Sequence, residues 1–312
     1  MSSPKKILAA ALAALSITAC QEPAPRSVIP SKVIHVTQPV ARAVEVRDAG
    51  APIAVVPVEV DSLAIATDAP HVDHLGRANQ LSSEGDVKGA LLEARRALFT
   101  TPSDVETLST VAKLARRAGH PELAAEAWGR VAAISPDDAL PLIAQARALI
   151  QLKDYSGAVT AGREASTRDS GSVEAFQVTG IAQLAMNELA GAIASFEKAV
   201  ELEPNHGWAL NNLGFALLRA NKNAQAVISL EHAAEVLPHV AYVQNNLGVA
   251  LERVGRGDEA KAAYQHAMDL SPKYVKARIN AARVAKVTQE PEEVPQVDET
   301  MSDMPHPIPE QQ

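Results

Sequence analysis

Residues 241–274 read AYVQNNLGVALERVGRGDEAKAAYQHAMDLSPKY, and residues 207–240 read GWALNNLGFALLRANKNAQAVISLEHAAEVLPHV. The two stretches align without a gap and place the same motif, NNLG, at positions 211–214 and 245–248. The period of 34 residues extends toward the N-terminus, and a column of six alanines follows it: Ala90, Ala124, Ala158, Ala192, Ala226 and Ala260. A period of this length indicates stacked supersecondary units.

Further columns keep the same phase, and each suits one place in a helical hairpin. Glycine or asparagine, with one lysine, recurs where a first helix would end, because these residues tolerate a left-handed cap. Proline recurs where it would block continuation of a second helix. Small residues recur where two helices would approach closely. The three columns are Gly85, Gly119, Lys153, Asn187, Asn221 and Gly255; Pro102, Pro136, Pro204, Pro238 and Pro272; and Ala78, Ala112, Ala146, Gly180, Gly214 and Gly248.

These columns resemble the tetratricopeptide repeat (TPR), whose signature places are occupied in residues 241–274 by Leu247, Gly248, Leu251, Ala260, Tyr264, Ala267 and Pro272. The resemblance implies an all-α fold, a right-handed α-solenoid of six TPR helix pairs followed by a C-terminal capping helix. A single pair cannot bury its apolar face alone, so the pairs must stack. The expected units are 71–104, 105–138, 139–172, 173–206, 207–240 and 241–274, with the capping helix at 275–288.

The first unit departs most from the pattern. His74 and Arg77 stand where large apolar residues are usual. We expect this of a terminal repeat with an exposed face.

Residues 1–19 have the features of a secretory signal peptide, since two lysines precede a short apolar run that ends in small residues. The end of this run resembles a bacterial lipobox, which implies that Cys20 is cleaved at its amino side and lipidated. Anchoring by several acyl chains is stable, whereas one chain gives only marginal binding. An ordinary signal peptide with an incidental cysteine is the alternative. Gln21 stands where an aspartate would signal inner-membrane retention, so we expect an outer-membrane lipoprotein facing the periplasm.

The two flanks of the repeats differ from them in composition. Residues 20–70 follow the lipobox and contain seven prolines and no aromatic residue, which indicates a flexible tether. Residues 289–312 contain five prolines, seven acidic residues and no lysine or arginine, which indicates a disordered acidic tail. Docking of this tail on the basic capping helix is an alternative.

The overall composition excludes several classes of function. The formal net charge is −8, so binding of nucleic acid through a general basic excess is not expected. The single cysteine excludes an intramolecular disulfide framework and a cysteine-based metal site. Aromatic residues make up only 3% of the chain, so the core must be built from small aliphatic side chains.

The first helices of tetratricopeptide arrays line the concave face, where ligands usually lie. Carrying those positions over predicts a partner-binding groove with exposed aromatic and arginine side chains, which are common binding hot spots. Packing of Trp208 and Tyr242 against the preceding unit is the alternative. The predicted groove residues are Leu140, Ile143, Arg147, Ile181, Leu184, Trp208, Asn211, Asn212, Phe215, Arg219, Tyr242, Asn245, Asn246, Val249, Arg253 and Asn280.

The asparagines among these residues also repeat at 34 residues, as Asn212, Asn246 and Asn280, with Asn211 and Asn245 beside two of them. An amide both donates and accepts hydrogen bonds, so such a series suits the backbone of an extended peptide. A structural role without a bound peptide is equally consistent with the pattern.

The sequence contains no P-loop, no HExxH, no G-x-S-x-G and no dinucleotide fingerprint, so we predict no enzymatic activity and no cofactor. His71, Asp73 and His74 cluster in one turn, but without further ligands they do not indicate a metal site.

The layout resembles the pilotin-type lipoproteins of type IV pili and the lipoproteins of tight-adherence pilus systems. That resemblance implies a non-catalytic, lipid-anchored periplasmic scaffold that assists assembly of an outer-membrane or pilus complex by binding a protein segment in its groove. The alternative is an adaptor that organises peptidoglycan enzymes or a periplasmic protease.

Overall fold

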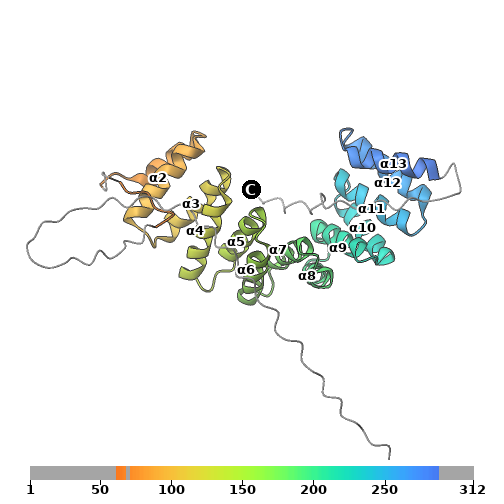
Figure 1. Cartoon of the computed structure of the whole chain (residues 1–312), viewed down its shortest axis with the longest axis horizontal. Helices are drawn as coiled ribbons and strands as arrows, with labels where there is room; N and C mark the ends of the chain where they lie inside the picture. Colours follow the sequence, from red (N-terminus) through yellow and green to blue (C-terminus); the bar gives the residue numbers. More distant parts are fainter. Residues whose placement is uncertain (1–60, 68–70, 288–312) are drawn as a thin grey trace, which may run out of the picture. The chain divides into compact units, whose positions relative to one another are not determined.

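The computed structural model describes residues 61–67 and 71–287 of the chain. Within these ranges the chain forms thirteen α-helices and no strand, so the expected all-α class is confirmed (Figure 1). The helices are α1 (His74–Ser83), α2 (Val87–Thr100), α3 (Val105–Arg117), α4 (Pro121–Ile134), α5 (Leu140–Gln151), α6 (Tyr155–Arg168), α7 (Val173–Ala185), α8 (Leu189–Leu202), α9 (Gly207–Arg219), α10 (Asn223–Val236), α11 (Ala241–Arg253), α12 (Gly257–Leu270) and α13 (Val275–Val287).

The helices form six consecutive pairs, and α13 follows as a seventh first helix. Each helix packs chiefly against its neighbours in the sequence. The first helices of adjacent pairs also touch one another, from α5 to α7, α9, α11 and α13. The first helices of this part of the chain therefore form one continuous layer, as the expected α-solenoid of helix pairs requires.

A left-handed residue ends the first helix of every pair. The positive φ angles fall on the whole predicted column, which is glycine at three positions and Lys153, Asn187 and Asn221 at the others. A side chain with a Cβ is strained in this conformation, and asparagine tolerates it better than lysine. Lys153, with a φ of 61°, is therefore the least suited residue of the column.

The column of small residues sets how closely the two helices of a pair approach. A Cβ atom on Gly214 would lie 2.4 Å from Cγ of Leu230, and one on Gly248 would lie 2.5 Å from the ring of Tyr264. Both large side chains are buried. The absence of a side chain on the first helix thus makes room for a large one on the second.

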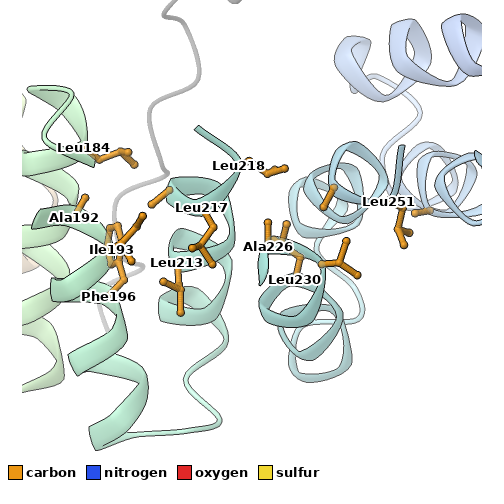
Figure 2. Close-up of a cluster of buried hydrophobic side chains, with 14 of the residues drawn as sticks. Leu184, Ala192, Ile193, Phe196, Leu213, Leu217, Leu218, Ala226, Leu230 and Leu251 are labelled. Carbon is orange, nitrogen blue, oxygen red and sulfur yellow. The ribbon is translucent and has the colours of Figure 1, made fainter. Parts of the chain in front are cut away.

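The largest hydrophobic cluster runs across helix pairs without interruption. It joins Leu184 of α7, Phe196 of α8, Leu217 of α9 and Leu230 of α10 to Leu251 of α11. Figure 2 shows these side chains pointing into the space between successive helices. Burial of apolar surface at about 25 cal/mol per Å² therefore holds each pair to the next and not only to itself.

Residues 61–67, called here the N-terminal strap, pack against the first two pairs. Leu63 is fully buried among residues of α2, α3 and α4. Nε of Arg95 donates to the Leu63 carbonyl over 2.8 Å, and Nη1 of Arg130 pairs with the Asp61 carboxylate at 2.8 Å. Packing against the array therefore begins at residue 61, ten residues before the expected boundary at residue 71, within the expected tether.

The strap also changes the environment of the first helix. Nε2 of His74 lies 3.0 Å from Oγ1 of Thr67, and its Nδ1 lies 2.6 Å from Oε2 of Glu93. Burial raises the pKa of Glu93, but hydrogen bonds from His74 and Arg96 outweigh it and hold that pKa below its usual value. The first unit was expected to expose His74. This prediction is wrong, because His74 is buried and Thr67 of the strap lies against it.

Several expectations concern residues outside the described ranges. These are the signal peptide at 1–19, the lipidation of Cys20, the tether up to residue 60 and the acidic tail at 289–312.

Replacing Lys153 by glycine should stabilise the array by roughly 0.5–1 kcal/mol, because it removes the left-handed strain of a side chain at this turn. Urea unfolding followed by circular dichroism measures the change. The matched control is Gly119→Lys at the equivalent turn, which should destabilise by a similar amount. Equal stabilities for Lys153→Gly and the original chain would contradict the assigned strain.

Candidate partner-binding surface

Three of the aliphatic groove residues on α5 and α7 lie in the core. Ile143, Ile181 and Leu184 are buried, although they were predicted to face a partner. They pack in hydrophobic clusters with residues of the second helices α6 and α8 and of the neighbouring first helices. The predicted groove is corrected at these positions, since side chains held between helices are not available to a ligand.

The asparagines form a buried amide layer between first helices. Nδ2 of Asn246 on α11 donates to Oδ1 of Asn211 on α9 over 3.0 Å. Nδ2 of Asn280 on α13 donates in the same way to Oδ1 of Asn245, also over 3.0 Å. Asn211, Asn212, Asn245 and Asn246 are buried, so the structure places them between repeats and corrects their assignment to an exposed peptide ladder.

One further position of the amide layer lacks its hydrogen bond. Oε1 of Gln177 and Nδ2 of Asn212 are buried and have no hydrogen-bond partner. These residues are 35 apart, like the two bonded pairs, and they offer one acceptor and one donor. Gln177 was not among the predicted groove residues. It stands one period before Asn211 and two periods before Asn245, and this shared column could have indicated its place in the layer.

Two arginines predicted in the groove tie α9 and α11 to the first helix that precedes each of them. Nη1 of Arg219 donates to the carbonyl of Leu184 over 3.2 Å, and Nη1 of Arg253 donates to that of Leu218 over 2.8 Å. The last carbonyls of a helix have no partner within it, and the helix dipole favours a cation there. These guanidinium groups therefore join successive repeats and do not extend freely toward a partner.

A smaller set of the predicted residues does reach the surface of the first-helix layer. Leu140 is 70% exposed at the start of α5, and Trp208 and Tyr242 are half-buried at the starts of α9 and α11. Phe215 and Val249 lie two turns further along the same helices and pack partly on the core. A spacing of seven residues places each such pair on one side of its helix. These five residues are called the apolar stripe.

Polar groups lie beside the apolar stripe. Arg253 is exposed, whereas Arg147, Arg219 and Asn280 are half-buried. The Tyr242 hydroxyl oxygen is buried, and this burial raises its pKa, so the ring and not the hydroxyl is the part that a partner can contact. The stripe with these groups has the mixture of rigid aromatic, aliphatic and guanidinium groups found at binding hot spots.

Other kinds of site are not found in the described part of the chain. In residues 61–67 and 71–287 no three histidine, cysteine, aspartate or glutamate side chains are grouped as metal ligands would be. Over the same ranges, no helix combines the length and the apolar content needed to span a bilayer.

Removing one amide of a bonded pair should be costly. Asn246→Ala leaves the buried Asn211 Oδ1 unpaired and should destabilise by about 1–3 kcal/mol. Asn211→Ala combined with Asn246→Ala should cost less than the sum of the two single changes, as measured in a double-mutant cycle by urea unfolding. Asn205→Ala removes an exposed hydrogen bond to His232 and is the control. An Asn246→Ala cost no larger than that of the control would argue against the amide layer.

This chain shares its repeat and its fold with known proteins. Sequence models of the tetratricopeptide repeat match residues 111–173, 174–206, 195–228 and 241–274. No curated protein sequence matches the chain. Pseudomonas aeruginosa pilF aligns with a TM-score of 0.55 and 20% identity over 69% of this chain and 98% of its own.

Two other solved structures have a similar fold. The APC/C hetero-tetramer Cut9–Hcn1 aligns with a TM-score of 0.54 and 15% identity, over 68% of this chain and 42% of that chain. A MamA RS-1 double mutant aligns with a TM-score of 0.50 and 21% identity, over 54% of this chain and 94% of that one. At these identities the likeness concerns the fold. The chain therefore contains tetratricopeptide repeats, and its helix pairs form an α-solenoid of that repeat.

Proposed function

We propose that the protein is a non-catalytic, lipid-anchored periplasmic scaffold that binds a segment of a partner protein along its first-helix layer. The partner is a component of an outer-membrane or pilus assembly. Tetratricopeptide arrays serve as protein–protein interaction scaffolds, and the apolar stripe is the observation that carries the proposal for this chain. It is the surface where a partner would find rigid aromatic groups beside arginines.

Buried hydrogen bonds between the first helices that carry the stripe support this role. The amide layer and the arginine-to-carbonyl bonds connect successive first helices, so the stripe residues of α9 and α11 are held in fixed relation. A surface that is ordered before binding loses less conformational entropy when a partner docks. An extended or helical segment with apolar side chains at regular spacing is the ligand that suits such a row.

The anchoring part of the proposal is supported by the sequence around Cys20, which lies outside the described residues. The strap lies between this part of the sequence and the first helix, and it contacts Arg95 of α2 and Arg130 of α4.

Trp208→Ala combined with Tyr242→Ala should weaken partner binding by about 2 kcal/mol or more, which is roughly a thirtyfold loss. Crosslinking of membranes followed by purification of the protein measures recovery of the partner. Ile228→Ala, which removes a 69% exposed side chain from the second helix α10, is the matched control and should leave recovery unchanged. Circular dichroism should show the helical signal and cooperative melting retained in both variants.

The outcomes separate the candidate functions. Recovery of secretin or pilus components supports the proposed assembly role, whereas recovery of peptidoglycan enzymes or a protease instead would contradict it and indicate an adaptor. Loss of cooperative melting in the double variant would show that the two rings are structural.

Cys20→Ser should move the protein from the membrane fraction to the soluble fraction, because the thioether-linked lipid can no longer form. Fractionation with a carbonate wash followed by immunoblotting measures the distribution. Thermal melting of the array should not change, since the described repeats begin far from this residue. Retention of the variant in the washed membrane would refute lipid anchoring.

A further inference from the structure

The last helix of the array has an exposed face with no second helix against it among the described residues. Val275 and Ile279 of α13 are 51% and 59% exposed, and Ala282 and Arg278 are exposed as well. Val275, Ile279 and Ala282 are spaced by four and three residues, so they lie on one side of the helix. The exposed side is therefore apolar, with a basic residue beside it.

In the preceding pairs the positions of Val275 and Ala282 are covered by the second helix or by the residue that follows it, whereas the position of Ile279 is occupied by Asn211 and Asn245, which bond to the next first helix. One period before Ala282 stands Gly248, which meets the Tyr264 ring of α12, and two periods before it stands Gly214, which meets Leu230 of α10. Gly207, two periods before Val275, meets the Leu237 side chain just after α10. At Val275 and Ala282, the exposed side of α13 is thus the side against which a second helix packs elsewhere in the array.

The acidic tail carries apolar residues in the register of such a helix. One period after the buried Ala260, Ala263 and Ala267 of α12 stand Val294, Val297 and Met301, and Met304 follows at the place of Leu270. Their spacing of three, four and three residues is that of one helix face. A helix starting at Val294 keeps Pro295 within its first turn, where proline is tolerated, and Pro305 ends it.

The charges of the two segments are complementary. Residues 275–287 contain four basic and no acidic residues, whereas residues 289–312 contain seven acidic residues and no lysine or arginine. In the sixth pair, the Tyr264 hydroxyl donates to Oε2 of Glu252 over 2.8 Å. One period later these two positions are Asp298 and Lys286, which carry opposite charges. The contact that joins α11 to α12 would become an ion pair.

We propose that residues 294–304 bind the exposed side of α13 as an amphipathic helix and complete a seventh repeat from the chain's own tail. Val294, Val297, Met301 and Met304 cover Val275 and Ala282, and the acidic residues face the basic ones of α13. The inference is independent of the proposed partner-binding role, because it concerns the end of the array and not the apolar stripe.

Covalent attachment favours the tail over any other occupant. In the sixth pair three residues separate α11 from α12, and here six residues separate α13 from Val294. A linker of this length holds the tail at an effective concentration of about 1 mM or more. A second copy of the chain, at micromolar concentration, competes at a large disadvantage for the same surface.

Hydrogen exchange of the full-length protein tests the proposal. The amides of 297–304 should exchange about tenfold or more slowly than in an unstructured peptide. Val297→Asp combined with Met301→Asp should return them to the unstructured rate and increase exchange in α13. Ile308→Asp places a negative charge beyond Pro305 and should change neither segment. Exchange of 297–304 at the unstructured rate in the original chain would overturn the proposal.

Engineered disulfides test the position of the tail in a Cys20→Ser background, which removes the only native cysteine. Ala282→Cys with Asp298→Cys should form an intramolecular bond under mild oxidation, because the equivalent pair, Gly248 and Tyr264, is in contact. Ala282→Cys with Glu310→Cys is the control and should crosslink at least tenfold less. Equal crosslinking in the two variants, or crosslinking between copies that grows with protein concentration, would contradict an intramolecular seventh repeat.

Discussion

The contact between one helix pair and the next is the constraint on which the rest of this structure depends. A two-helix hairpin of about 34 residues is too thin to enclose a core, so its apolar side is stable only against a neighbour. The small residues at Gly180, Gly214 and Gly248 allow the helices within a pair to approach until Phe196, Leu230 and Tyr264 fill the space. The same side chains belong to the hydrophobic cluster that continues across pairs.

Polar groups strengthen this stacking where apolar side chains are absent. The amides of Asn211 and Asn246 bond to each other in a buried position, and Arg219 and Arg253 satisfy carbonyls at the ends of preceding helices. A buried polar group costs free energy unless it is paired, so these contacts favour one register between repeats over all others. Because that register fixes the first helices relative to one another, it also fixes the positions of the exposed side chains that they carry.

At each end of the array one helix lacks a neighbouring repeat, and the two ends differ in what lies against that helix. At the start, the strap buries Leu63 and covers His74, while Arg95 and Arg130 hold its backbone and its acidic residue. At the other end, α13 is attached through the ion pair of Arg283 with Glu252 and through the Asn280–Asn245 hydrogen bond. Its outer side stays apolar and exposed among the described residues, so the two ends of the array are not equivalent.

The sequence by itself determined the period, the pairing of helices and the turns, because each depends on local properties that recur every 34 residues. The column that contains Lys153 marked the turns, and the positive φ angles fall on it. Exposure was decided only by the tertiary structure. Ile143, Leu184 and Asn211 have the sequence positions of groove residues, yet contact between first helices buries them, and Leu63 belongs to the core despite its proline-rich flank. Burial depends on the separation and rotation of neighbouring helices, which no single repeat encodes.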